Sequence, residues 1–160
     1  TVSFKKQSMH CPRSLGQCFR RTVMIDRVSA TEKTVELIGE LISVHGPLLF
    51  HQSGGCCDGS APMCFPRGDF RVGSRDVLLG NICDQPFFIA DDQFTYWEHT
   101  QLIIDVVPGR GGMFSIEGPT GKRFLTRSRV FSDEESNLLQ AHPPLRASDI
   151  NDIDGLKTTS

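Results

Sequence analysis

The sequence lacks long apolar runs. No stretch approaches the roughly 18 apolar residues of a membrane-spanning helix, and the basic N-terminal stretch lacks the apolar segment of about seven residues or more that a secretion signal contains. We therefore expect a cytoplasmic protein without a membrane partner. In a reducing compartment its six cysteines are expected to be free thiols, metal ligands or redox groups rather than structural disulfides.

An excess of charge of one sign is lacking too. The 17 lysines and arginines nearly balance the 19 aspartates and glutamates, which leaves a net charge of −2. Without a global basic field we expect no nucleic-acid partner. No internal repeat is found, and 160 residues fit one domain that can bury its core without covalent cross-links.

The patterned part of the chain predicts a single α+β domain over residues 29–142. A capping-box pattern at Ser29–Glu32, followed by apolar residues at helical spacing, predicts an N-terminal helix that Gly46–Pro47 ends. Asp91–Asp92 are expected to cap a short middle helix. A second capping box at Ser132–Glu135 predicts a C-terminal helix.

Between the helices, short apolar runs bounded by turn residues predict a compact, mixed, mainly antiparallel sheet with a barrel-like shape. These runs are Leu48–Phe50, Met63–Phe65, Val77–Leu79, Pro86–Ile89, Leu102–Val107, Met113–Ile116 and Phe124–Thr126. Gly118–Gly121 is expected to be a hairpin-like connection. Outside the domain, we expect a flexible extension over residues 1–28 and a polar, disordered tail over residues 143–160.

The stretch HQSGGCCDGSAPMC, residues 51–64, holds the residues best suited to chemistry. It follows a buried strand and contains the adjacent cysteines Cys56 and Cys57, with two glycines before them and Gly59 after them. Glycines let the backbone turn sharply, so the thiols are expected at the tip of a rigid strand. Backbone N–H groups exposed in such a turn lower the pKa of thiols, which favours a role as ligands or nucleophiles.

Three thiols and two imidazoles form a candidate site for zinc, iron or an iron-sulfur cluster, because these metals prefer such ligands. The candidate ligands are Cys56, Cys57, Cys64, His51 and His99. No C-x-x-C spacing occurs, and two adjacent cysteines bind one metal with poor geometry, so one of the pair is expected to face the site and the other the core. Two alternatives stay open: the cysteines can be small buried residues, and the histidines can be hydrogen-bonded structural residues.

Other features are given structural interpretations. Cys83 belongs to neither cysteine cluster and is expected to be structural. Pro108–Gly112 resembles a phosphate-binding loop only loosely, because it joins two strands. Arg123, Arg127 and Arg129 share one face of a strand, where pairing with carboxylates is expected and an anionic ligand is the alternative.

Longer motifs resemble a known family. The segments HGPLLFHQSGGCCDGSAPMC, DVLLG, FTYWEHTQLIIDVVPGRGGMFSIE and GKRFLTRSR are similar, between Ser29 and Glu135, to small bacterial proteins known only as a domain of unknown function. Genes of that family commonly lie beside those of aldehyde dehydrogenases. The resemblance therefore implies a role near aldehyde or alcohol oxidation, with an aldehyde dehydrogenase as partner.

The turn also resembles, more distantly, that of the A-type iron-sulfur carriers, which are small sheet-rich domains with an N-terminal helix. Those proteins have an S-G-G-C-x-G turn after a helix and a strand, and this chain has the sequence SGGC over residues 53–56, with Gly59 beyond it. The likeness implies Cys56 as a cluster ligand. The C-x-C pair near the C-terminus of the carriers has no counterpart, because no cysteine follows Cys83.

Three hypotheses about function result. In the first, a non-enzymatic accessory protein, monomeric or homo-oligomeric, binds a metal ion or cluster through the cysteine turn. In the second, a thiol-based redox or aldehyde-handling protein uses its vicinal dithiol on the oxidised cysteine of an aldehyde dehydrogenase, or on the aldehyde itself. In the third, the cysteines are structural and the aromatic segment Phe94–Trp97 contacts the dehydrogenase.

Overall fold

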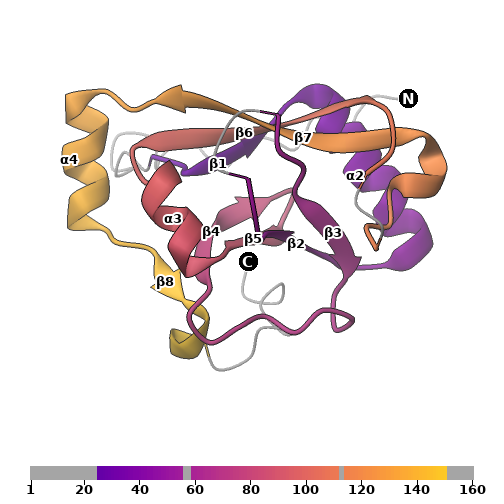
Figure 1. Ribbon diagram of the computed structural model, residues 1–160, viewed down its shortest axis with the longest axis horizontal. Helices are drawn as coiled ribbons and strands as arrows, with labels where there is room; N and C mark the ends of the chain where they lie inside the picture. Colours follow the sequence, from indigo (N-terminus) through magenta and orange to yellow (C-terminus); the bar gives the residue numbers. More distant parts are fainter. Residues whose placement is uncertain (1–24, 56–58, 112–113, 151–160) are drawn as a thin grey trace, which may run out of the picture.

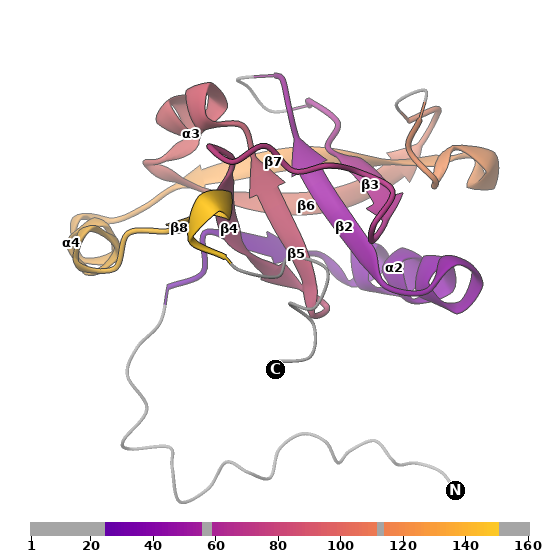
Figure 2. The ribbon, with the colours of Figure 1, turned by 90° about the horizontal axis from the view of Figure 1, so that it is seen from below.

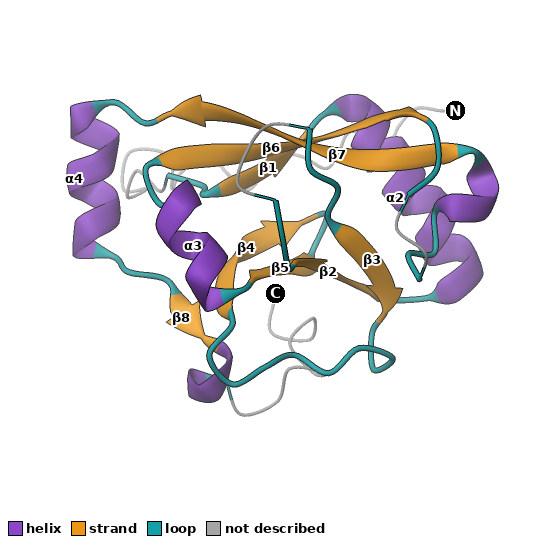
Figure 3. Cartoon of the chain, viewed as in Figure 1, coloured by secondary structure: helices purple, strands orange, loops and turns teal. Residues whose placement is uncertain are grey.

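The computed structural model describes residues 25–55, 59–111 and 114–150. These residues contain two β-sheets and three α-helices (Figures 1 and 3). The helices are α2 (Glu32–His45), α3 (Asp91–Trp97) and α4 (Asp133–Ala141). The strands are β1 (Val28–Ala30), β2 (Leu48–Gln52), β3 (Met63–Pro66), β4 (Val77–Ile82), β5 (Gln85–Ile89), β6 (Thr100–Pro108), β7 (Lys122–Val130) and β8 (Leu145–Arg146). The predicted α+β class and its three helices are confirmed.

The strands form two open sheets. The smaller sheet has the order β1-β6-β7, and the larger one has the order β3-β2-β5-β4-β8. The pairs β1/β6 and β2/β5 are parallel and the others antiparallel, so the mainly antiparallel expectation is confirmed. The described strands do not close into the expected barrel-like shape, because the end strands of each sheet do not pair with each other.

One main core fills the space between the two sheets and α2. Phe50 of β2 meets Phe124 of β7 edge to face, with ring centroids 5.2 Å apart, and stacks on Phe87 of β5 at 6.0 Å. On its other face the larger sheet carries a smaller cluster around Leu49 and Phe88. Because both faces of this sheet are covered, every residue of β2 is buried.

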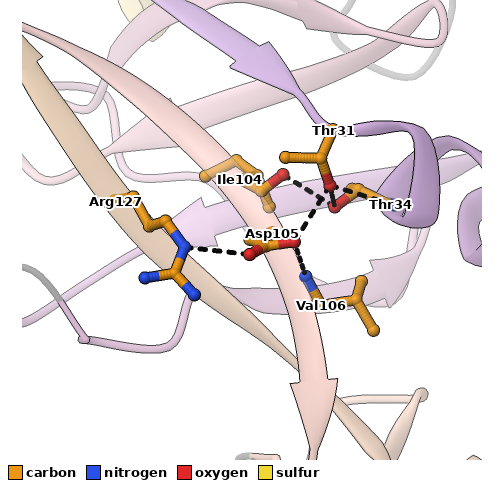
Figure 4. A network of polar contacts seen from close by, with 6 residues as sticks. All are labelled: Thr31, Thr34, Ile104, Asp105, Val106 and Arg127. Atoms are coloured by element: carbon orange, nitrogen blue, oxygen red, sulfur yellow. Dashed lines mark hydrogen bonds and ion pairs between the residues drawn. The ribbon is translucent and has the colours of Figure 1, made fainter.

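The N-terminus of α2 differs from the prediction. The capping residue is Thr31 rather than Ser29, because β1 pairs with β6 and holds Ser29 in a strand. The Thr31 hydroxyl accepts from the backbone N–H of Thr34 at 3.4 Å and donates to Asp105 of β6 at 3.0 Å. The Arg127 guanidinium of β7 donates to the same carboxylate at 2.9 Å (Figure 4). One network therefore ties α2 to both long strands.

The other helices follow their predictions in part. Ser132 and Glu135 form the expected capping box of α4. Helix α3 exists as expected, but its N-cap is Ala90, without a side-chain cap. Residues 114–116 are turn and coil rather than a strand, and residues 118–120 form a short 3-10 helix, η3, where a hairpin-like connection was expected.

The ordered chain extends beyond residue 142, where the sequence predicted a disordered tail. Strand β8 pairs with β4, and the short 3-10 helix η4 (Ala147–Asp149) buries Ala147 in the smaller cluster. Helices α2 and α4 lie at opposite ends of the molecule (Figures 1 and 2). Within the described residues, no helix has the length and hydrophobicity to cross a membrane. Residues 1–24 and 151–160 lie outside the described part.

Candidate functional site

Strand β2 leads directly into the cysteine turn. Cys56 and Cys57 themselves lie outside the described residues, but the segments on either side of them are described. At Gly55 the backbone has φ +87°, and a Cβ there would lie only 2.3 Å from Cβ of Ser60. The two stems of the turn, residues 53–55 and 59–60, therefore meet so closely that only glycine fits at position 55.

The stems are attached to two neighbouring elements. The backbone N–H of Gly59 donates to the carbonyl of Thr126 at 2.8 Å, and the N–H of Thr126 donates to the carbonyl of Ser60 at 2.8 Å. On the other stem, the indole N–H of Trp97 in α3 donates to the carbonyl of Gly55 at 3.1 Å. Strand β7 and helix α3 thus hold the two ends of the turn in place.

A buried glutamine joins the two stems. Gln52, the last residue of β2, is fully buried. Its Oε1 accepts from the hydroxyl of Thr126 at 3.0 Å, while its Nε2 donates to Ser60 Oγ at 3.2 Å and to the carbonyl of Gly54. A buried amide without hydrogen-bond partners costs free energy. Gln52 therefore favours the arrangement in which both stems and β7 form hydrogen bonds with its side chain.

Cys64 is buried away from solvent. It lies on β3 opposite Phe50, faces the main core and is fully buried. Burial, with a smaller contribution from the charge of Glu117, raises the pKa of its thiol. A thiol that stays protonated is neither a nucleophile nor a good metal ligand.

His51 and His99 lie elsewhere. Side chains alternate along β2, so His51 points to the face opposite Phe50 and Cys64. There its Nε2 lies 2.8 Å from Asp76 Oδ2, and its ring packs against Phe70 with centroids 4.8 Å apart. His99 is exposed between α3 and β6. The structure therefore does not bring the expected ligands His51 and Cys64 together.

No group of three or more His, Cys, Asp or Glu side chains suited to a metal ion occurs within residues 25–55, 59–111 and 114–150. Cys56 and Cys57 were outside that set. His51 and Cys64 point to opposite faces of the larger sheet and thus do not share one metal site, whereas the prediction for Cys56 and Cys57 lies outside the described residues.

The structure also shows the surroundings of the basic stripe on β7 and of Cys83. Arg127 pairs with Asp105 at 2.9 Å, and Arg129 pairs with Glu135 at 2.8 Å, so pairing with carboxylates accounts for these two arginines of the basic stripe. Cys83 is exposed in the turn between β4 and β5. Partial burial and the neighbouring Asp84 raise the pKa of its thiol.

Sequence reasoning missed the residues that hold the stems. Gln52 was the detectable one, because it is an amide residue at the end of the run LLFHQ, directly before the glycine turn. Thr126 and Trp97 gave no such signal: each becomes a partner of the turn only through strand and helix placement far along the chain.

The family follows from the same part of the chain. Residues 37–130, which run from the middle of α2 to the end of β7, match the family model of a domain of unknown function, DUF779. The chain belongs to the DUF779 family. Neither a curated protein nor a solved structure matches it. In this DUF779 protein the matched region contains the cysteine turn and the described residues that hold its stems.

Proposed function

We propose that this DUF779 protein is a thiol-dependent accessory protein of aldehyde or alcohol oxidation, in which Cys56 and Cys57 act as a vicinal dithiol. The observation that supports it is the attachment of both stems of the turn. Gly55 is held by Trp97, and Gly59 and Ser60 are held by Thr126. The two stems that flank the cysteine pair are thus held by a rigid scaffold, as the surroundings of a reactive group should be.

The two described cysteines are less suited to thiol chemistry than Cys56 and Cys57. Cys64 is buried and cannot react with molecules in solvent, and Cys83 is a lone thiol whose pKa is raised. Adjacent thiols differ from these because either one can attack and the other can then resolve the product.

The proposed substrate is an oxidised cysteine of a partner enzyme. One thiolate of the pair attacks the sulfur of a disulfide at that cysteine and expels the other sulfur as a thiolate, which gains a proton. The second thiolate then attacks the resulting mixed disulfide and releases the partner's cysteine as a thiol. A disulfide between Cys56 and Cys57 remains, two electrons have passed to the partner, and a small-molecule thiol reduces the pair again.

The partner class rests on the resemblance of the motifs to a family encoded beside aldehyde dehydrogenases. Such enzymes use a reactive cysteine, which is the group most sensitive to oxidation. The proposed role is therefore to restore that cysteine.

A second candidate is binding of zinc, iron or an iron-sulfur cluster by Cys56 and Cys57. It is favoured by the fixed stems together with the likeness of residues 53–59 to the turn of the iron-sulfur carriers. Because His51 and Cys64 face opposite sides of the larger sheet, they cannot both join Cys56 and Cys57 at one metal, and His99 or a second copy of the chain would supply the remaining ligands.

The test measures alkylation rates against pH, mapped to individual cysteines by mass spectrometry, on reduced protein purified anaerobically. Exposed Cys83 and buried Cys64 serve as internal references. We expect at least one of Cys56 and Cys57 to react with a midpoint below the free value of about 8.5. The same preparation is analysed for metal and acid-labile sulfide.

The functional arm adds the reduced protein to an aldehyde dehydrogenase whose reactive cysteine has been converted into a mixed disulfide with a small thiol, and follows recovery of activity. The wild type should restore activity, whereas Cys56→Ser and Cys57→Ser should not, and Cys83→Ser should behave as the wild type. The dithiol proposal would be refuted if Cys56 and Cys57 react as ordinary thiols and the dehydrogenase recovers no activity. Near-stoichiometric metal that is lost in Cys56→Ser would instead support the second candidate.

A further inference from the structure

The segment Phe114–Glu117 covers an otherwise free sheet edge. Strand β3 is at the end of the larger sheet, and β2 is its only strand partner among the described residues. The backbone N–H of Cys64 donates to the hydroxyl of Ser115 at 2.8 Å, and the N–H of Ile116 donates to the carbonyl of Cys64 at 3.0 Å. Unpaired strand edges invite association, so this cover segment closes a vulnerable side of the sheet.

A carboxyl group is buried beneath that segment. Glu117 is 0% exposed. Its Oε1 lies within hydrogen-bond distance of the Ser115 hydroxyl, while its Oε2 has no hydrogen-bond partner in the described part of the molecule. A Cβ on Gly111 would lie only 2.4 Å from Oε2, so the glycine-rich loop packs directly on the carboxyl group.

No positive charge compensates this carboxyl group among the described residues. Cys64 of β3 is close enough for the charge of Glu117 to help raise the pKa of its thiol, and Arg123 of β7 packs on Gly111; no ion pair joins Arg123 to Glu117. Burial raises the pKa of Glu117, against smaller opposing effects of the Ser115 hydroxyl and of backbone N–H groups. An uncompensated buried carboxylate is costly, so the neutral form is favoured.

The hydrogen-bond pattern also fits a protonated acid. The Ser115 hydroxyl has one proton and two acceptors in reach, Glu117 Oε1 and the Cys64 carbonyl at 3.5 Å. If Glu117 carries a proton on Oε1, it donates to Ser115, and Ser115 can donate to Cys64. An ionised Glu117 would take the serine proton for itself and leave its other oxygen charged and unpartnered.

We infer that Glu117 is a proton-bearing latch, which in its neutral form holds the cover segment on the edge of β3 and on ionisation releases it. The inference does not depend on the chemistry of Cys56 and Cys57. Because burial raises the pKa of Glu117 in the folded state, its stabilising contribution is fully present at low pH and is lost as the pH rises through that raised value.

The test is hydrogen exchange of the backbone amides of Cys64 and Ile116, corrected for the intrinsic pH dependence of exchange, together with the alkylation rate of Cys64. The opening equilibrium of the wild type should rise by about tenfold per pH unit between the ordinary pKa of glutamate, which applies to the open form, and the raised pKa of the closed form, because opening releases one proton in that range. In Glu117→Gln the corrected opening equilibrium should be independent of pH. Glu134→Gln removes an exposed carboxylate from α4 and should keep the wild-type slope.

A flat wild-type profile, or equal slopes in the wild type and Glu117→Gln, would overturn the inference. Carbon NMR of the Glu117 carboxyl group in the wild type gives an independent measurement that needs no variant to fold. A titration midpoint at or below the ordinary glutamate value would equally refute the latch, whereas a raised midpoint at the pH where the rise of the opening equilibrium levels off would support it.

Discussion

Replacing Gln52 by methionine is the sharpest perturbation of the candidate site. Methionine keeps the length of the side chain and removes all three hydrogen bonds to Thr126, Ser60 and Gly54. Gly54 is exposed and Ser60 partly so, which lets water replace their bonds, whereas Thr126 is fully buried. At about 1 kcal/mol per lost bond, and up to about 3 kcal/mol for a buried group left unpaired, Gln52→Met should lower the free energy of unfolding by about 3 kcal/mol.

The matched control is Gln85→Met. Gln85 is also buried, and its amide accepts from Leu48 N–H and donates to the Cys83 carbonyl, both at 2.7 Å, at the other end of β2. Urea unfolding should show losses of similar size in the two variants. Only Gln52→Met should slow alkylation of Cys56 and Cys57 at pH 7, by about tenfold if the thiol pKa rises by one unit.

Two results would refute this reasoning. A loss below about 0.5 kcal/mol in Gln52→Met would mean that the buried amide does not hold the stems. Equal thiol reactivity in the two variants, at equal loss of stability, would mean that the orientation of the stems does not control the cysteines.

Three further predictions concern the framework. Gly111→Ala should destabilise the protein by about 1–3 kcal/mol in chemical denaturation, because its Cβ would meet the buried carboxyl group of the latch; at Gly118 a Cβ meets nothing within 4 Å, and alanine there should be nearly neutral. Asp105→Asn should lower the free energy of unfolding by about 1 kcal/mol at pH 7. The difference from the wild type should shrink in acid. The Arg127 hydrogen bond lowers the pKa of Asp105, so the wild type loses the stability that this ion pair contributes as the pH falls through the lowered value. In an NMR titration Glu135 should show a pKa of about 2, which returns towards 4.5 in Arg129→Gln because the Arg129 hydrogen bond is its main cause.

Local signals in the sequence identified most elements of the fold. The apolar periodicity of α2, the turn at Gly46–Pro47 and the capping box at Ser132 each depend on residues within a few positions of one another, and all three are present. Ser29 was mistaken for a cap because its neighbours fit a capping pattern. The parallel pairing of β1 with β6 overrides that pattern, and no local signal reports it.

The candidate site was predictable only as far as the turn. The glycines and the adjacent cysteines mark a special backbone in the sequence itself. Which face of a strand His51 or Cys64 occupies depends on register, and a shift of one residue exchanges the two faces. Nothing in the sequence indicated that Glu117 is buried. Its burial depends on the packing of the loop around Ser115 against β3, some fifty residues earlier in the chain, and composition does not report such a contact.

The smaller sheet combines β1 with β6 and β7, which come much later in the sequence, and this affects how the protein folds during synthesis. Strand β1 and helix α2 leave the ribosome early, yet β1 pairs with β6, and the hydroxyl of Thr34 donates at 2.7 Å to the carbonyl of Ile104. Until β6 has been synthesised, the apolar side of α2 lacks the smaller sheet, which contributes one side of its core. Contacts that join such distant segments form slowly, so the newborn chain is expected to acquire its structure late and all at once, and to depend on chaperones during that interval.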